Sequence, residues 1–377
     1  MISYISIRNF KSHADTALDL SNLNLFTGMN GMGKSSVMQA FLLLRQTYEK
    51  NMLDKGLELR SNLCSLGTAK DALYQSAEDD IISFTLGPGN NKVYRWSFKT
   101  NENRPNDTFI KIEPDSIGNI SNLNEYSLFN NRFQYISAFR NGPVHDYEKD
   151  TSAVEMFNQI SQKDGRCELV AHYLDYFKNK PVSHPSLKKN KNDNDKRLLT
   201  QVKSWLQEIS PEIDIHIHPQ ETGYKVNYSF SRGAGKTSTN EFKAHNIGFG
   251  ISYTLPIIVA ALHSPKDSIV LIENPEAHIH PEAQAKLMEL ISKAAKAGVQ
   301  FIIETHSDHI LNGLLVSVKK QIINPNETKV YFFDRETTMH ETKVMNLPVL
   351  EGGKIKKPPK KFFDRMDKDL DTLMDID

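Results

Sequence analysis

The glycine-rich segment Gly28-Met-Asn-Gly-Met-Gly-Lys-Ser35 constrains the fold more than any other part of this chain. It matches the pattern G-x-x-x-x-G-K-[ST] and lies between a short predicted strand, residues 24–27, and an apolar helical pattern, residues 35–48. Glycines let backbone N–H groups converge on phosphate oxygens, and the positive end of the following helix adds to the attraction. The segment therefore predicts a strand, a phosphate-binding loop and a helix.

Most residues of this segment are expected to bind a nucleotide. Lys34 should reach the β- and γ-phosphates, and the Ser35 hydroxyl should ligate Mg²⁺. The residues that we expect to bind the nucleotide here are Gly28, Asn30, Gly31, Met32, Gly33, Lys34, Ser35 and Ser36.

Two apolar runs further along the chain end in polar residues of the kind that a nucleotide site needs. The run 269–272 is followed by Glu273, which we expect to hold Mg²⁺ together with Ser35. After the run 299–303 comes His306, whose imidazole can hydrogen-bond a γ-phosphate or the attacking water. Alone, Glu273 would most often mark a strand end and His306 a structural histidine. Their order after the glycine-rich segment favours a site.

A second glycine-containing segment, residues 245–253, precedes an apolar helical pattern that runs towards residue 262. Taken alone, it would most often be a turn and a helix cap. Together with the other motifs, it predicts a second phosphate-binding surface that a facing subunit would use. The residues expected to contribute are Asn246, Gly248, Gly250 and Ser252.

Composition excludes several classes of protein. The 46 Lys and Arg residues balance the 46 Asp and Glu residues, so the chain is not a generally polycationic binder. Only Cys64 and Cys167 are present, which excludes a disulfide framework and favours a reducing cytoplasm. No window reaches about 18 uninterrupted apolar residues, so we expect neither a secretion signal nor a membrane partner.

The remaining patterns predict an α/β fold with a mixed sheet. Alternating runs at 81–86, 94–98 and 109–112 predict an antiparallel β subdomain, and residues 213–245 read as β again. Residues 151–210 look mainly helical, and the segment 268–303 predicts a βαβ unit. We expect one domain over 1–377, made of segments 1–150, 151–245 and 246–350 and a charged tail, 351–377.

The stretch 178–197 carries seven basic and two acidic residues. We interpret it mainly as a solvated tether, and contact with DNA phosphates is the alternative. The triplet Asn9-Phe-Lys11 has two readings as well, since it could lie near a nucleotide base or cap the first hairpin.

The order of these motifs resembles the ABC-type ATPase heads of the SMC, RecF and overcoming-lysogenization-defect group of P-loop NTPases. In that resemblance residues 28–35 are Walker A, 246–252 a degenerate signature motif, 269–273 Walker B and His306 the switch histidine. A closer likeness is to stand-alone bacterial ATPases of phage-defence loci, which have a segment like Tyr135–Pro143 and a Phe-Phe-Asp, here 362–364. The resemblance implies ATP and Mg²⁺ as ligands.

One departure from this family pattern affects catalysis. The usual Asp-Glu-Pro-Glu reads Glu273-Asn-Pro-Glu276 here, so the position of the water-activating acid holds Asn274. Either Glu276 or His306 would have to act in its place, and turnover is expected to be slow. We therefore assign Glu273, Glu276 and His306 as the catalytic candidates.

The resemblance also implies partners. It implies a homodimer in which ATP is bound between the two subunits, and a higher oligomer is also possible under it. It further implies control of a separately encoded effector, such as a nuclease or toxin, in antiviral defence. The rivals are a non-hydrolysing nucleotide-dependent scaffold, a DNA-binding repair ATPase and, third, a transporter subunit. About 45 residues follow the strand predicted at 329–334, too few for a Toprim nuclease domain. The tail is expected to dock, bind a partner or be disordered.

Overall fold

The structure is a computed structural model, and it describes all residues except 89–91, 115, 117–119, 191–193, 233–236, 337, 339, 357, 360–361, 363–371 and 373–377. The turn expected at 233–235, residues 191–193 of the basic stretch and residues 363–364 of the Phe-Phe-Asp motif lie outside the described residues.

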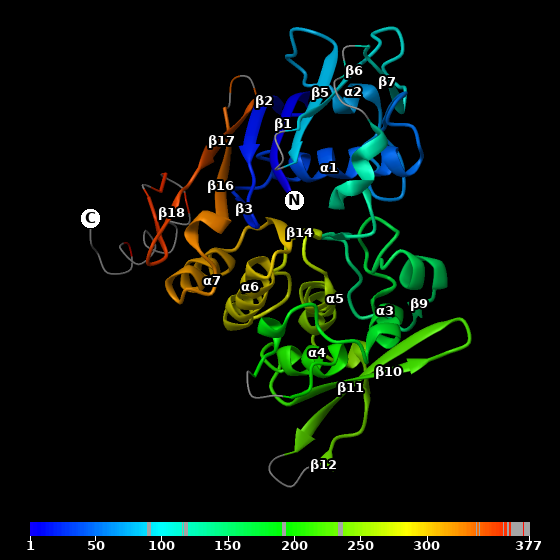
Figure 1. Ribbon diagram of the computed structural model, residues 1–377, viewed down its shortest axis with the longest axis vertical. Helices are drawn as coiled ribbons and strands as arrows, with labels where there is room; N and C mark the ends of the chain where they lie inside the picture. The colour runs from blue at the N-terminus through cyan, green and yellow to red at the C-terminus, as the bar shows by residue number, and fades with distance from the viewer. Residues whose placement is uncertain are drawn as a thin grey trace.

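A six-stranded mixed sheet runs through the middle of the molecule in the order β17-β16-β3-β15-β14-β8 (Figure 1). Five strands are parallel neighbours: β3 (Leu23–Thr27), β8 (Phe133–Ile136), β14 (Ile269–Glu273), β15 (Gln300–Glu304) and β16 (Thr328–Arg335). The edge strand β17 (Thr342–Asn346) is antiparallel to β16. Every residue of β3, β14 and β15 is buried, because both faces of a parallel sheet are covered.

The N-terminal lobe packs on one face of this sheet. Its antiparallel sheet has the order β2-β1-β5-β6-β7-β4. The strands are β1 (Ile2–Phe10), β2 (His13–Asp19), β4 (Gly56–Glu58), β5 (Ile81–Pro88), β6 (Tyr94–Lys99) and β7 (Phe109–Ile112), and the lobe also holds α1 (Lys34–Glu49) and α2 (Ala69–Ala72). One apolar core joins Phe84 of this sheet, Phe41 of α1 and Phe26 of the central sheet. The predicted antiparallel subdomain is thus confirmed.

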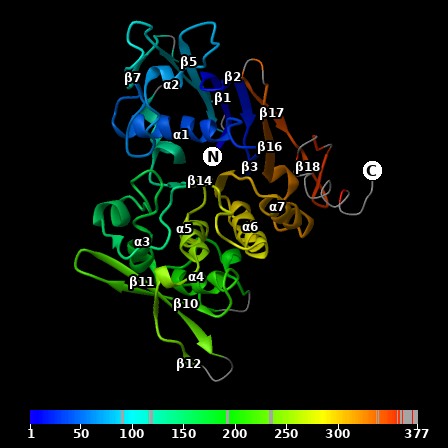
Figure 2. The ribbon, with the colours of Figure 1, turned by 180° about the vertical axis from the view of Figure 1, so that it is seen from behind.

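Helices cover the other face of the central sheet, as Figures 1 and 2 show from opposite sides. They are α3 (Val170–Phe177), α4 (Leu198–Leu206), α5 (Phe249–His263), α6 (Pro281–Lys296) and α7 (Asp308–Lys319). A second apolar core joins them to Leu25 and Phe301, whose side chains point away from the first core. The predicted βαβ unit is β14-α6-β15, with both strands parallel. Residues 151–210 are less helical than expected, since no helix covers residues 157–169, whereas the tether expected at 178–197 does lie between α3 and α4.

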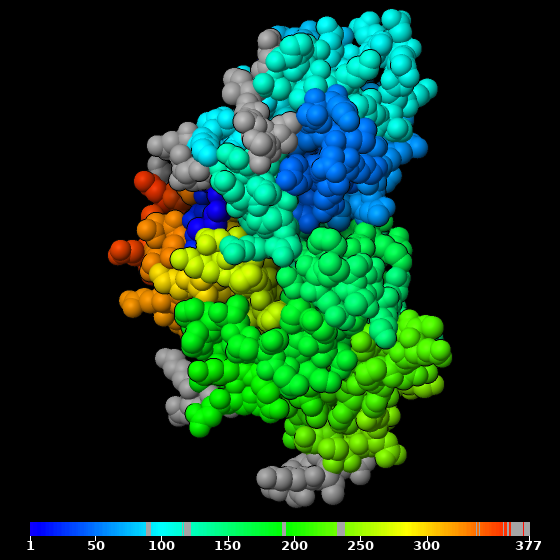
Figure 3. Space-filling model, turned by 45° about the vertical axis from the view of Figure 1, so that its right-hand side comes forward, coloured from blue at the N-terminus to red at the C-terminus, as the bar shows by residue number. Residues whose placement is uncertain are grey.

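Segment 151–245 ends in a β structure that extends from the helical lobe, and the space-filling view shows it at the end opposite the N-terminal lobe (Figure 3). Its strands are β10 (Ile213–Pro219), β11 (Gly223–Arg232), β12 (Thr237–Ser238) and β13 (Phe242–Lys243), and the short β9 (Tyr147–Glu148) pairs with β11.

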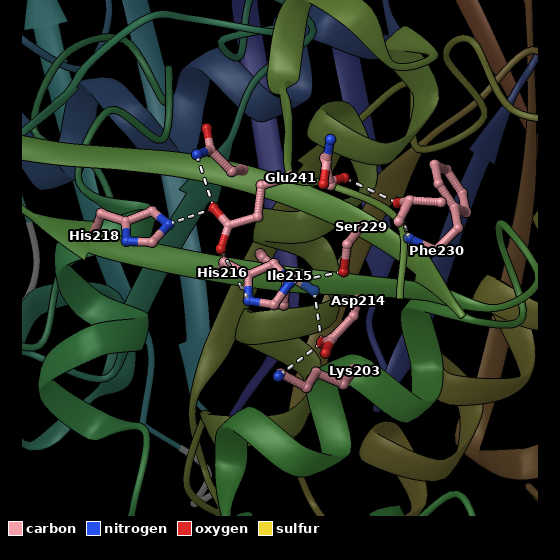
Figure 4. A network of polar contacts seen from close by, with 11 residues as sticks. Lys203, Asp214, Ile215, His216, His218, Ser229, Phe230 and Glu241 are labelled. Carbon is pink, nitrogen blue, oxygen red and sulfur yellow. Dashed lines mark hydrogen bonds and ion pairs between the residues drawn. The ribbon is translucent and has the colours of Figure 1, made fainter. Parts of the chain in front are cut away.

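A polar network on this β structure joins its strands (Figure 4). The Glu241 carboxylate contacts His218 Nε2 at 2.7 Å, Asn227 Nδ2 at 3.0 Å and His216 Nδ1 at 3.8 Å. Lys203 of α4 pairs with Asp214 of β10 at 2.7 Å. None of these residues lines the cavity described below, so the network serves the architecture of this segment.

Segments 1–150 and 246–350 both contribute strands to the central sheet, because β3 and β8 come from the first and β14, β15, β16 and β17 from the second. The division of the chain into four segments stays a prediction. Beyond residue 346 come β18 (Val349–Leu350) and β19 (Lys354–Ile355), and the ring of Phe362 lies 5.6 Å from that of Phe332 on β16. This part of the tail therefore packs against the sheet.

Candidate nucleotide-binding site

The predicted site residues meet at one edge of the central sheet. The carboxyl ends of β3, β15 and β14 are neighbours there, so the glycine-rich loop, the segment before His306 and the segment after Glu273 lie side by side. A cavity of about 1790 Å³ opens at this edge. It is lined by Lys11, Ser12, Gly28–Ser36, Tyr74, Gln75, Asn274, Glu304, His306, Phe332, Arg335 and His340.

The backbone of the loop explains its glycines. Gly28, Gly31 and Gly33 have φ values of +135°, +76° and +97°, in a region that side chains with a Cβ disfavour. A Cβ on Gly28 would also collide with the carbonyl oxygen of Phe333 on β16. The loop therefore keeps its shape only with glycine at these positions.

Side chains of two edge strands, β2 and β17, hydrogen-bond carbonyls of the loop. His13 of β2 has its Nε2 3.0 Å from the Gly33 carbonyl and its Nδ1 2.9 Å from the Thr16 hydroxyl. Burial lowers the pKa of His13 to about 4, so the ring is neutral and donates from Nε2 to the carbonyl. The Thr342 hydroxyl of β17 lies 3.2 Å from the Met32 carbonyl. Sequence reasoning missed both supports.

The first turn of α1 is open to an anion. Gly33 precedes the helix, no described side chain caps it, and its first turn holds no acidic residue. Lys34 Nζ donates to the carbonyls of Gly28 at 2.8 Å and Met29 at 2.7 Å, and burial lowers its pKa. The ammonium group therefore lies over the loop, at the place where a phosphate would meet the free N–H groups.

Ser35 contacts a carboxylate that the sequence analysis did not assign. Its hydroxyl donates to Glu304 Oε1 at 2.9 Å. Glu304 is only 5% exposed, and its burial raises its pKa to about 7, with the neighbouring Glu273 adding to the rise. An acidic residue at the end of the apolar run 300–303, directly before Thr305-His306, was the sequence signal available for it.

Glu273, the expected Mg²⁺ ligand, is oriented differently. Its Oε1 accepts a hydrogen bond from the Tyr135 hydroxyl and its Oε2 one from the Ala138 backbone N–H, both at 3.1 Å. The residue is buried and does not line the cavity, and burial raises its pKa. The structure thus brings Glu304, and not Glu273, to Ser35.

The two residues proposed to replace a water-activating acid occupy different positions. His306 is exposed and lines the cavity together with Gly28, and burial lowers the pKa of its imidazole. Glu276 lies behind it: Oε1 accepts from the His306 backbone N–H at 2.9 Å, and Oε2 accepts from the Thr305 hydroxyl at 2.7 Å. Asn274 lines the cavity with a φ of +45°. Of the two candidates, His306 is the one that faces the cavity.

The segment expected to serve a facing subunit lies outside this cavity. Asn246, Gly248 and Gly250 line a separate groove of about 560 Å³ at the start of α5. Asn246 and Gly248 are exposed, but Ser252 is 3% exposed and its side chain faces the buried hydroxyl of Tyr147. The expectation that the Ser252 hydroxyl faces a phosphate is therefore corrected, since this hydroxyl points into the core.

A buried arginine joins this segment to the nucleotide edge. Arg140 is 1% exposed, and its guanidinium group donates to four carbonyls: Tyr253 on α5 at 2.9 Å, Ser137 at 2.9 Å, Glu273 at 2.8 Å and Asn274 at 2.7 Å. The start of α5 and the end of β14 are thus held by one side chain.

The contacts of the triplet 9–11 and of the basic stretch 178–197 bear on the alternatives left open for each of them. Of the triplet only Lys11 lines the cavity, because Asn9 donates to Asp79 at 2.7 Å and Phe10 is buried in the core. In the basic stretch, ion pairs within the chain hold three cations, with N···O distances between 2.6 and 2.9 Å: Lys178–Asp175, Lys189–Glu208 and Arg197–Asp195. These pairs favour the tether over a DNA contact.

The fold and the site define a P-loop protein with a mixed sheet in which β15, the strand before His306, lies between β3 and β14. Residues 23–312 match the family model described as "AAA domain, putative AbiEii toxin, Type IV TA system". This match covers more than half of the chain, and the protein belongs to this AAA domain family. Residues 323–373 match a second model, "Protein of unknown function (DUF3696)".

The fold is that of SMC heads. One similar structure is an SmcHead bound to the C-winged helix domain of ScpA, with 13% identity and a TM-score of 0.52 over 92% of this chain and 98% of that one. Another is the Smc head domain with an extended coiled coil bound to the C-terminal domain of ScpA from Pyrococcus furiosus, with 13% identity and a TM-score of 0.50 over 100% and 99%. No curated protein matches the chain. In the described part of the chain, no helix combines the length and apolarity needed to cross a membrane.

Proposed function

We propose that this protein binds Mg-ATP at residues 28–35 and hydrolyses it slowly, and that ATP joins two copies into a dimer. The observation that carries the proposal is the loop itself, with three positive-φ glycines, an uncapped helix start and Lys34 directed onto its carbonyls. Membership of the AAA domain family and the SMC-head fold support the same reading.

The residues at the loop fit a divalent cation. The Ser35 hydroxyl and the Glu304 carboxylate lie side by side, and Glu304 Oε2 is a buried oxygen with no hydrogen-bond partner among the described residues. When bound, Mg²⁺ would neutralise the charge on the β- and γ-phosphate oxygens. Lys34 would bind the same phosphates, and His306 would orient the attacking water or hold the γ-phosphate by a hydrogen bond.

The dimer that we propose uses the exposed start of α5. Asn246 and Gly248 of one copy would face the nucleotide of the other, with backbone N–H groups at the helix start binding the γ-phosphate. Two exposed aromatic side chains belong to the segments that meet here: Phe249, the first residue of α5, at 58% exposure, and Phe139, at 81%, which precedes the Arg140 that bonds α5. Exposed aromatic residues of this kind are typical anchors of an interface.

The output that we propose is control of a separately encoded effector, a nuclease or another toxin, in antiviral defence. The description of the matching family, which names a toxin of a toxin–antitoxin system, supports an effector-linked role. Co-purification of the native complex with and without ATP would identify the effector. If no other protein co-purifies in either condition, this part of the proposal is contradicted.

Phosphate release and light scattering test the core of the proposal. Wild-type protein should release phosphate from ATP and form a dimer in ATP and Mg²⁺, whereas Lys34→Ala should do neither, because it removes the only ammonium group that contacts the described loop carbonyls. Lys320→Ala, a change of an exposed lysine, is the matched control. Phosphate release by wild type no faster than by Lys34→Ala would contradict hydrolysis.

That last outcome would favour a second candidate function, a nucleotide-dependent scaffold. The observation behind it is Asn274, an amide that lines the cavity where the family pattern has a carboxylate. ATP-dependent dimerisation without phosphate release would support the scaffold. Glu276→Gln separates the two further, because it should slow release only if the carboxylate has a part in orienting His306 for hydrolysis.

A further inference from the structure

The strand order places Glu304 closer to the phosphate-binding loop than Glu273. β15 lies between β3 and β14, so Glu304 at its end is the direct neighbour of Phe26 on β3 and of Glu273 on β14. Glu273 is one strand further from the loop. Position in the sheet therefore favours Glu304 as the carboxylate that can act together with Ser35.

The hydrogen bonds of the two carboxylates also favour Glu304. Both oxygens of Glu273 already accept hydrogen bonds, from Tyr135 and from the Ala138 backbone. Glu304 uses Oε1 for Ser35, but no described residue donates to Oε2 although the residue is 95% buried. A buried carboxylate oxygen without a partner is costly, and such groups usually have a ligand.

The hydrogen bond between Ser35 and Glu304 is compatible with a cation on Ser35. A hydroxyl has one proton and two lone pairs, so Ser35 can donate to Glu304 Oε1 and still offer a lone pair to a metal. In this arrangement Glu304 fixes the direction of the hydroxyl, as residues behind a metal ligand commonly do. Its Oε2 remains available to the cation or to a water bound to it.

The kind of ligand follows from what surrounds the two side chains. No group of three or more His, Cys, Asp or Glu residues that could hold a metal occurs among the described residues. A cation that needs a complete protein cage is thus excluded there, whereas Mg²⁺ typically binds through one or two carboxylates, water and substrate phosphates. We propose that Glu304, and not the Walker B residue Glu273, is the main carboxylate of the divalent-cation site, with Oε2 receiving the cation or one of its waters.

This inference rests on the proposed nucleotide binding, and the experiment separates the two. Binding of ADP would be measured by calorimetry in EDTA and in Mg²⁺, and binding of Mn²⁺ to the ADP complex by electron paramagnetic resonance. The variants are the isosteric Glu304→Gln and Glu273→Gln, with Glu304→Asp to test rescue by a shorter carboxylate. Circular dichroism and a thermal melt verify that each variant is folded.

For Glu304→Gln we expect ADP affinity in EDTA to be kept or increased, because a negative charge near the phosphates is lost. Its affinity for Mn²⁺ in the ADP complex should fall by about tenfold or more. Glu273→Gln should change Mn²⁺ binding less, and Glu304→Asp should recover part of it. Wild-type Mn²⁺ affinity in Glu304→Gln, or a larger loss in Glu273→Gln, would overturn the inference alone. Failure of the wild type to bind ADP in either condition would overturn the proposed function and this inference with it.

Discussion

Replacing Arg140 with alanine should destabilise the protein and uncouple the start of α5 from the nucleotide edge. The guanidinium group makes four hydrogen bonds to carbonyls and is 1% exposed. A hydrogen bond from a charged donor contributes about 1.5–3 kcal/mol, and water entering the vacated space would recover a large part of the loss over the four bonds. We expect the free energy of unfolding to fall by about 3–5 kcal/mol. Arg140→Lys should lose less, since it keeps the charge but lacks the planar set of donors.

Urea denaturation followed by circular dichroism measures this effect, and light scattering in ATP and Mg²⁺ measures the coupling. Arg132→Ala, at an exposed position eight residues earlier, is the matched control and should stay within about 0.5 kcal/mol of wild type. ATP-dependent dimerisation should weaken in Arg140→Ala under conditions where the variant is still folded. A loss of stability below about 1 kcal/mol, with dimerisation unchanged, would refute the reasoning.

Three further predictions concern the loop and the dimer surface. The pKa of His13 falls from 6.5 to about 4 on folding, so the free energy of unfolding should decline by about 3 kcal/mol as the pH falls from 6.5 towards 4. His13→Gln should lack this decline in urea titrations at several pH values. Gly33→Ala should cost about 1–3 kcal/mol and weaken ATP binding in calorimetry, because φ is +97° and a Cβ would collide with the Thr342 hydroxyl. Phe249→Asp should weaken ATP-dependent dimerisation about tenfold or more in light scattering, because Phe249 is an exposed aromatic residue beside Gly248.

Matched controls accompany these three changes. Gly352→Ala has a φ of +78° with open space around its Cβ, so it should show strain without loss of ATP binding. Val316→Asp is an exposed apolar position on α7 and should leave the dimer intact. A parallel pH dependence of wild type and His13→Gln, full ATP affinity in Gly33→Ala, or an unaltered dimer in Phe249→Asp would each contradict the corresponding prediction.

The phosphate-binding loop could be predicted from the sequence because its determinants are local. The spacing of Gly28, Gly33 and Lys34 between an apolar strand pattern and a helical one specifies a strand, a loop and a helix without reference to the rest of the chain. The continuous apolar runs of β14 and β15 likewise indicated buried parallel strands, and the structure confirms the pair.

The side-chain contacts that complete the site depend on segments far apart in the sequence. Glu304 follows an apolar run just as Glu273 does, and only the strand order shows that it is the one beside Ser35, 269 positions away. The inward direction of Ser252 follows from packing against Tyr147 on β9, and the role of Arg140 depends on three separate segments meeting around it. Hydrophobic periodicity and motif spacing do not show which distant segments will be in contact in the fold.

A structure with a non-hydrolysable ATP analogue and Mg²⁺ tests the central claim most directly. The phosphates should lie against the backbone N–H groups of residues 28–35, and Lys34 Nζ should leave the carbonyls of Gly28 and Met29, which it contacts at 2.8 and 2.7 Å, to bind them. An analogue bound elsewhere, with Lys34 still on those two carbonyls, would contradict the account.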